Sequence, residues 1–156
     1  MTSPSTRPRT WILPPAPFAA AIVGGWWLDR HRWALPMAVG ETTRWLGWLP
    51  VALAVLLFSW SLLTLRRHRT TVNPFRGAAA LCIDGPFAFS RNPIYLADWF
   101  VLAGASLILA TAWPLVFAPV VWGLVRYGVI RHEEAHLEAA FGESYRSYRQ
   151  RVRRWL

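Results

Sequence analysis

The sequence contains one cysteine and no lysine, and each shortage excludes something. Cys82 has no partner for an internal disulfide, and no histidine stands at a metal-ligand spacing from it, so we expect no metal site. Because lysine is absent, all 17 basic residues are arginines, and they are set against only eight acids. The resulting net charge of +9 suits a chain that meets either nucleic acid or anionic lipid.

The composition is more apolar than a soluble domain of this length can accommodate. The 156 residues leave room for a single domain, residues 1–156. Hydrophobic residues make up 54% of them, 11 are tryptophans, and the mean hydropathy is +0.26. A small domain cannot bury that much apolar surface. We therefore predict an integral membrane protein whose arginines meet lipid, with no nucleic-acid partner.

Four apolar stretches predict an all-α protein with four transmembrane helices, at about residues 11–28, 45–65, 94–112 and 114–130. The second stretch is the clearest, because it has no charge and a membrane span needs about 20 apolar residues. The first stretch follows a basic start but lacks a small-residue cleavage site. We therefore expect a retained helix there, not a cleaved signal peptide.

The third and fourth stretches admit two interpretations, because no residue from Trp99 to Val125 is charged. A single helix over this range would measure roughly 40 Å, which exceeds a hydrocarbon core of about 30 Å unless the helix tilts. A break at Thr111-Ala112-Trp113-Pro114 would instead give a tight hairpin of two similar arms. We favour the hairpin, and the tilted single helix remains the alternative.

Arginine placement predicts the orientation. The connector 66–93 and the tail 131–156 are rich in arginine, whereas the hairpin tip has none. The positive-inside rule then places both segments in the cytoplasm, and four spans place the N-terminus there too. The loop 29–44, which carries three arginines, is the discordant element.

The tail 131–156 is too polar to span a membrane. It is predicted to form a cytoplasmic helix, a break at Gly142, and a basic aromatic end. Glu134 interrupts an otherwise apolar helical stripe, and Glu133 flanks it. A carboxylate on such a face must be paired, protonated or bound to a ligand. The alternative is a helix that leaves the membrane with its acids in water or paired with Arg131 and Arg126.

Three motifs in order, "TTVNP", "GPFAFSRNPIYLA" and "RHEEAHLEAAFGESYRSYRQRVRRWL", resemble the isoprenylcysteine carboxyl methyltransferase family and its bacterial relatives. That group is itself similar to the phospholipid N-methyltransferases. The resemblance covers about residues 70–156, and the first two helices match only as generic membrane helices. Two positions depart from the family pattern. Asn92 stands where eukaryotic members have histidine, and Ala97 replaces the usual glycine.

The resemblance implies S-adenosylmethionine as methyl donor and a lipophilic acceptor that enters from the bilayer. It also implies a bacterial inner-membrane protein with a cytoplasm-facing site. By motif, the residues expected to bind the cofactor are Arg91, Asn92, Pro93, Tyr95, Glu133 and Glu134. The catalytic candidates are Arg131, Glu134 and Arg151, the two arginines as holders of an anionic acceptor or of the cofactor carboxylate.

The acceptor class stays open at the level of sequence. A lipophilic carboxylate or thiol is favoured, and an amine on a phospholipid head group is the first alternative. A non-catalytic membrane protein that keeps the scaffold, as a lipid-binding or partner subunit, is the second. The sequence does not specify an oligomeric state.

Asp98 is an acid just inside the third apolar stretch. It lies fifteen residues before Trp113, and Arg126 lies thirteen residues after it. At 1.5 Å per residue, roughly 22 and 20 Å separate the two side chains from the hairpin tip. Unpaired charges within a membrane are costly. We predict that Asp98 faces the bundle, paired with Arg126 or lining the cofactor mouth; the alternative is water contact among the head groups.

Overall fold

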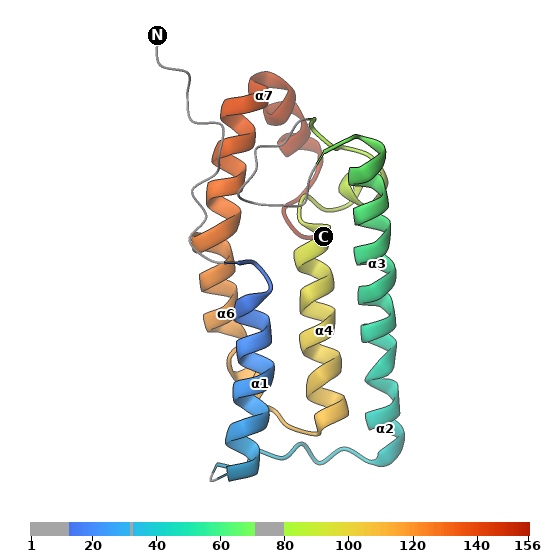
Figure 1. Cartoon of the computed structure of the whole chain (residues 1–156), viewed down its shortest axis with the longest axis vertical. Helices are drawn as coiled ribbons and strands as arrows, with labels where there is room; N and C mark the ends of the chain where they lie inside the picture. Colours follow the sequence, from blue (N-terminus) through green and yellow to red (C-terminus); the bar gives the residue numbers. More distant parts are fainter. Residues whose placement is uncertain (1–12, 32, 71–79) are drawn as a thin grey trace.

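The computed structural model describes residues 13–31, 33–70 and 80–156 (Figure 1). These residues confirm the predicted all-α class. The elements, in chain order, are α1 (Ala16–His31), α2 (Glu41–Leu46), α3 (Trp48–Arg67), the 3₁₀ turn η1 (Gly85–Ala88), α4 (Pro93–Leu109), α5 (Trp113–Val116), α6 (Ala118–Val125), the π-helical turn η2 (Arg126–Ile130) and α7 (Arg131–Arg151).

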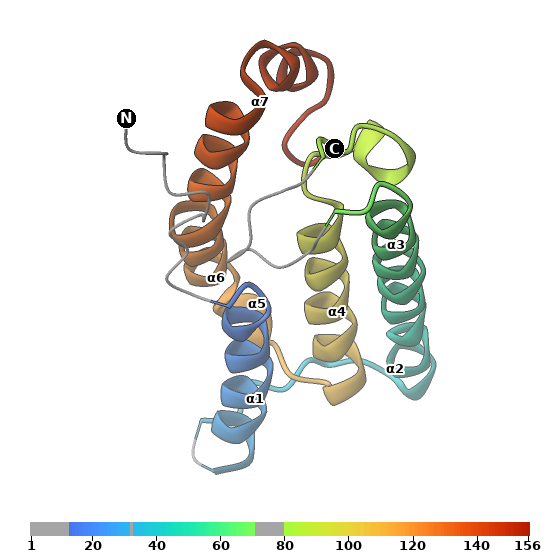
Figure 2. The same cartoon turned by 45° about the horizontal axis from the view of Figure 1, so that its top comes forward.

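The long helices α1, α3, α4 and α6 run alongside one another, and α6 continues through η2 into α7 (Figures 1 and 2). The end of α3, the start of α4 and α7 lie at one end of the bundle, and the turn between α4 and α5 lies at the other. α4 packs closely on α3. A Cβ on Gly104 would lie only 2.6 Å from Cγ2 of Val51, so the two backbones approach where a side chain would keep them apart.

The predicted hairpin is confirmed, and the single-helix alternative is wrong. α4 ends at Leu109, Ala110 adopts a left-handed conformation with φ 53°, and the chain turns back into α5. The last turn of α1 and the loop after it satisfy the polar groups of this turn. The Thr111 hydroxyl donates to Oδ1 of Asp29 at 3.1 Å, and the Ala112 N–H donates to the Leu35 carbonyl at 3.0 Å.

Other predicted boundaries shift by a few residues. The second stretch begins earlier, at Glu41, and is divided by Gly47 into α2 and α3. The third begins at Pro93, as expected for a proline at the first helical position. Part of the first predicted helix, residues 11 and 12, lies outside the described residues, and α1 itself continues to His31. Gly142 kinks α7 with φ 51° and ψ −120°, as the tail pattern predicted.

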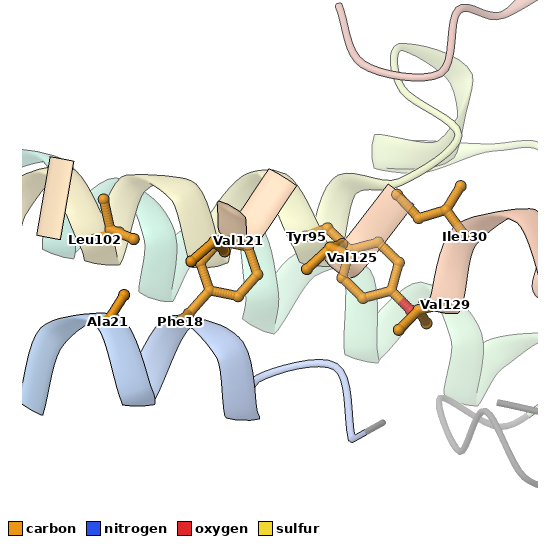
Figure 3. Close-up of a cluster of buried hydrophobic side chains, with 8 residues drawn as sticks. All are labelled: Phe18, Ala21, Tyr95, Leu102, Val121, Val125, Val129 and Ile130. Carbon is orange, nitrogen blue, oxygen red and sulfur yellow. The ribbon is translucent and has the colours of Figure 1, made fainter. Parts of the chain in front are cut away.

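The core lies between α1, α4 and the α6–η2 segment (Figure 3). It consists of apolar side chains and one tyrosine: Phe18, Ala21, Tyr95, Leu102, Val121, Val125, Val129 and Ile130. Val121, Val125 and Val129 recur every fourth residue and so share one face. Ile130 lies on the same face because the π-helical turn η2 has a wider, i→i+5 winding than an α-helix. The additional residue in this turn sets the direction in which α7 presents Glu133 and Glu134.

Of the residues that the structure describes, one helical stretch, α2 and α3 taken together over Glu41–Arg67, is long and apolar enough to cross a membrane. It has 27 residues and a mean hydropathy of 2.0, and only 17% of its apolar stretch is buried. Pro93–Leu109 is apolar but shorter. The presence of a membrane-capable helix agrees with the expected class, whereas the number of four spans stays a prediction.

Candidate functional site

Three segments that are distant in sequence meet at the α7 end of the bundle: the loop before α4, the first turn of α7, and residues 152–155. The kink at Gly142 turns the chain back toward the start of α4 (Figure 2). There the Arg91 N–H donates to the Arg153 carbonyl at 3.0 Å. The Asn92 amide and the Ser90 hydroxyl both donate to the Arg154 carbonyl, at 2.9 and 3.3 Å. Hydrogen bonds therefore join residues 90–92 to residues 153–154, and we call these two joined segments the lip.

A cluster of one carboxylate and two guanidiniums lies behind this lip. Glu134 accepts from Nε and Nη2 of Arg154 at 2.9 and 2.7 Å, and Nη1 of Arg91 lies 3.0 Å from its Oε1. Only 9% of the Arg91 side chain and 14% of the Glu134 side chain are exposed, against 27% for Arg154. Arg91 also donates to the Tyr145 hydroxyl at 3.2 Å. The cluster is thus buried, well hydrogen-bonded and positively charged.

The neighbouring acid has a different environment. Glu133 accepts a hydrogen bond of 2.8 Å from the Tyr95 hydroxyl, which belongs to the buried core. Burial raises the pKa of Glu133 to about 7; the bond from Tyr95 works against this rise, and the charge of Glu134 adds to it. The two adjacent acids therefore have different partners: Glu134 is bound by two arginines, whereas the raised pKa of Glu133 suits that carboxyl to exchanging a proton near neutral pH.

Two buried nitrogen atoms beside this cluster have no hydrogen-bond partner among the described residues. They are Nε of Arg91 and Nδ1 of His132. Leaving a buried donor unpaired costs about 1–3 kcal/mol, so such atoms are rare in native proteins. The free Nε–H of Arg91 is therefore a donor that an anionic group of a ligand could use.

The structure brings some of the predicted site residues together and leaves others apart. Arg91, Tyr95, Glu133 and Glu134 meet as described, and Asn92 and Pro93 are buried at the lip. Arg131 and Arg151 are exposed and lie outside the cluster. The Arg131 guanidinium lies 6.0 Å from the Tyr127 ring, and Arg151 donates to the Ser147 carbonyl of its own helix at 3.4 Å.

Sequence reasoning missed two members of the cluster, Arg154 and Tyr145. Both stand in the part of the tail that the sequence marked only as a basic aromatic end. The signal in the sequence was Glu134 itself, because a carboxylate on an apolar helix face needs a partner. The sequence offered Arg131 and Arg126 for that role, but the kink at Gly142 supplies Arg154 instead.

The predicted pairing of Asp98 with Arg126 is wrong. The Arg126 guanidinium lies over two aromatic rings on the outer side of its helix, 4.8 Å from Trp122 and 5.7 Å from Tyr127. Asp98 forms no ion pair among the described residues, is partly buried, and stands one helical turn after Tyr95. A similar number of residues from the hairpin tip did not suffice, because Arg126, at the start of η2, lies against Trp122 and Tyr127 and not against Asp98 of α4.

Comparison with known proteins agrees with this arrangement. The family model described as phospholipid methyltransferase matches residues 42–144, about two thirds of the chain. This chain belongs to the phospholipid methyltransferase family. The match contains Arg91, Tyr95 and both acids, but it ends just before Tyr145. The resemblance found in the motifs is therefore confirmed, while Arg154 lies beyond the matched region.

Two relatives of this family member are informative. It is 33% identical over 73 residues to the protein-S-isoprenylcysteine O-methyltransferase of Schizosaccharomyces pombe, which is 46% of this chain and 30% of that enzyme. It is 38% identical over 63 residues to an uncharacterized protein of Haemophilus influenzae, 40% of this chain and 90% of that protein. The chain thus matches less than a third of the yeast enzyme's length. No solved structure matches.

Proposed function

We propose that this protein transfers a methyl group from S-adenosylmethionine to a lipophilic acceptor, in the manner of an isoprenylcysteine carboxyl O-methyltransferase. Family membership and the yeast relative support a methyltransferase. One observation supports the proposed site: residues of two separate motifs meet, with the Tyr95 hydroxyl 2.8 Å from Glu133, 38 residues farther along the chain. Arg91 and Glu134, from the same two motifs, lie 3.0 Å apart.

The residues present fit the proposed cofactor. S-adenosylmethionine carries an ammonium, a carboxylate and a sulfonium cation. The unpartnered Nε–H of Arg91 offers a donor for the carboxylate. Glu133, which has a single hydrogen bond from Tyr95, keeps acceptor capacity for the ammonium or the ribose hydroxyls. Glu134 is already engaged by two arginines, so we assign it to holding Arg91 in place, and not to direct contact.

The cofactor, when bound, supplies a methyl group that is already activated on sulfur. The task left to the protein is to orient donor and acceptor and to exclude water. The positive cluster of Arg91 and Arg154 around one carboxylate would draw an anionic acceptor toward the lip. A carboxylate acceptor needs no general base, which is consistent with Asn92 at the position where eukaryotic relatives have histidine. Asp98, one turn below Tyr95, would border the same polar mouth.

The exposed arginines Arg131 and Arg151 remain part of this proposal as contacts for an anionic acceptor or for head groups. Both stand in α7, at the same end of the bundle as the arginines that close α3 (Figure 1). With the hairpin at the opposite end, this distribution supports an integral inner-membrane protein whose site and termini face the cytoplasm. If α1, α3, α4 and the α6–η2 segment each crossed the membrane, the lip would lie at the membrane surface.

Methylation of a phospholipid amine is the second candidate, and Glu133 favours it. An amine must lose a proton before or during methylation. A carboxyl whose pKa is raised by burial to about 7 is suited to accept one. A third possibility, a non-catalytic protein that binds lipid on the same scaffold, predicts no affinity for the cofactor.

Binding of S-adenosylhomocysteine to the purified protein, measured by calorimetry, tests the proposal. We expect measurable affinity that Glu133→Gln and Tyr95→Phe each weaken by about tenfold or more, as loss of a charge-assisted bond implies. Glu138→Gln, on the exposed side of the same helix, is the control. Absence of binding by the folded protein would contradict the proposal.

Acceptor classes are then separated with a labelled methyl donor. Lipids that carry a carboxylate, a thiol or an amine are offered in otherwise identical bilayers. Label on the carboxylate lipid supports the O-methyltransferase, and label on the amine lipid supports the second candidate.

A further inference from the structure

A second cluster of reactive side chains lies at the end of α3, away from the acids of α7. His68 follows the last residue of that helix, and Cys82 and Asp84 stand just before η1. Nε2 of His68 lies 2.9 Å from Oδ1 of Asp84, and Sγ of Cys82 lies 3.6 Å from the same oxygen. The three potential ligand atoms all lie within 4.8 Å of one another. We propose that this cluster binds a divalent cation of the zinc class.

Two of the three separations between ligand atoms are close to those that a metal would impose, whereas the third, between Cys82 and His68, lies within 4.8 Å and would shorten on binding. Ligand atoms 2.0–2.3 Å from a tetrahedral zinc lie roughly 3.3–3.6 Å from each other. The observed separation of sulfur and carboxylate oxygen, 3.6 Å, agrees with this value. The His68–Asp84 separation needs to widen by a few tenths of an ångström. One thiol, one imidazole and one carboxylate form a ligand set suited to zinc or cobalt, and not to magnesium or calcium.

The fold holds these ligands in place. Gly85 has φ +55°, and a Cβ there would lie 2.8 Å from Oγ1 of Thr64, so the loop rests directly on the last turns of α3. This contact brings Asp84 beside His68. Farther along the turn, Tyr148 of α7 donates to the Phe87 carbonyl at 2.7 Å. The ligands are thus fixed by contacts that do not depend on the cluster itself.

One side of the His68–Cys82–Asp84 cluster is open to solvent. Cys82 is buried, with 7% exposed, whereas 37% of the His68 side chain and 60% of the Asp84 side chain are exposed. A cation would therefore sit between a buried sulfur and solvent, with a water molecule as fourth ligand. It would also join the end of α3 to the loop that leads to Arg91. The expected role is structural: to fix the base of the lip.

Cobalt binding to the tag-free, fully reduced protein in detergent tests the proposal. We expect one equivalent of Co²⁺ and an intense thiolate-to-cobalt charge-transfer band. Cys82→Ser should abolish the band and lower affinity by about 100-fold or more, because even outer-sphere partners of metal ligands are worth 10–100-fold. Serine preserves size and the hydrogen bond to Asp84, so this variant should stay folded.

His68→Gln and Asp84→Asn should each weaken binding, and Zn²⁺ should raise the melting temperature of the parent protein but not of Cys82→Ser. His31→Gln is the matched control, because that histidine bonds to the Trp27 carbonyl on α1. Unchanged cobalt binding in Cys82→Ser or His68→Gln would overturn the proposal. So would the absence of binding to the folded parent protein, which would leave a hydrogen-bonded cluster alone.

Discussion

The charge of Glu134 is expected to stabilise the lip more than any surface acid of the same helix. In Glu134→Gln the shape of the side chain is kept and the charge is removed. Arg91, with 9% of its side chain exposed, would then stay buried without a counter-charge. Breaking a buried pair in this way costs about 3–5 kcal/mol. Arg154, at 27% exposed, can turn toward water, so we expect the lower end of that range.

Thermal unfolding in detergent measures this effect. For a chain of this size, 1 kcal/mol shifts the melting temperature by about 2–4 °C, so Glu134→Gln should lower it by about 6–12 °C. Glu138→Gln is the control, because Glu138 also pairs with an arginine, Arg149, at 3.0 Å, but 37% and 45% of the two side chains are exposed. An exposed pair contributes about 0–1 kcal/mol. Equal shifts in the two variants would refute a buried, structurally important cluster.

The same variant has a consequence for ligand binding. If Glu134 holds Arg91 in position for the cofactor carboxylate, Glu134→Ala should weaken S-adenosylhomocysteine by about 1.5–3 kcal/mol, the value of a charge-assisted hydrogen bond. Calorimetry at a temperature where both proteins are folded separates this loss from instability. Unchanged affinity would remove Glu134 from the site.

Four further outcomes follow from the structure. Affinity for S-adenosylhomocysteine should rise between pH 6 and 8 as Glu133 ionises, and Glu133→Gln should flatten the profile in calorimetry. Because the pKa of Glu133 in the folded protein, about 7, lies above the ordinary 4.5, stability should fall as pH rises from about 4.5 to about 7 and level off above, which melting curves will show. Gly85→Ala should cost about 1–2 kcal/mol from the left-handed φ alone, whereas Gly123→Ala, in open space, should be neutral or stabilising. Reporter fusions after Leu65 and Trp113 should read cytoplasmic and external; the reverse would overturn the orientation.

Local patterns were sufficient to predict the helices and the hairpin. An apolar run without charge, a proline at a helix start and a glycine in a polar helix each act through neighbouring residues. They located α3, the turn at residues 110–112 and the kink at Gly142. The motifs likewise identified Arg91 and Glu134 as site residues, but only the structure shows that their side chains are in contact.

What the sequence could not supply was the direction of side chains and of the returning chain. Residue counts along the helices predicted a matching depth for Asp98 and Arg126, yet the Arg126 guanidinium at the start of η2 lies over the Trp122 ring instead. Arg151 and Arg154 are three residues apart in one basic segment. Only the path after Gly142 decides that Arg154 reaches Glu134. His68 and Cys82 likewise lie close together because of the tertiary fold, although their separation in the sequence is not one typical of metal ligands.

The π-helical turn η2 makes the placement of the acids sensitive to chain length at one point. Each residue of an α-helix advances the rotation by about 100° and the axis by 1.5 Å. Deleting one residue within Arg126–Ile130 would restore regular α-helical winding and rotate all of α7 by that amount. The side chain of Glu133 would then point away from Tyr95, although all residues of the sequence motifs would be retained. A single codon gained or lost here would therefore be enough to move the same acids to another face of the helix.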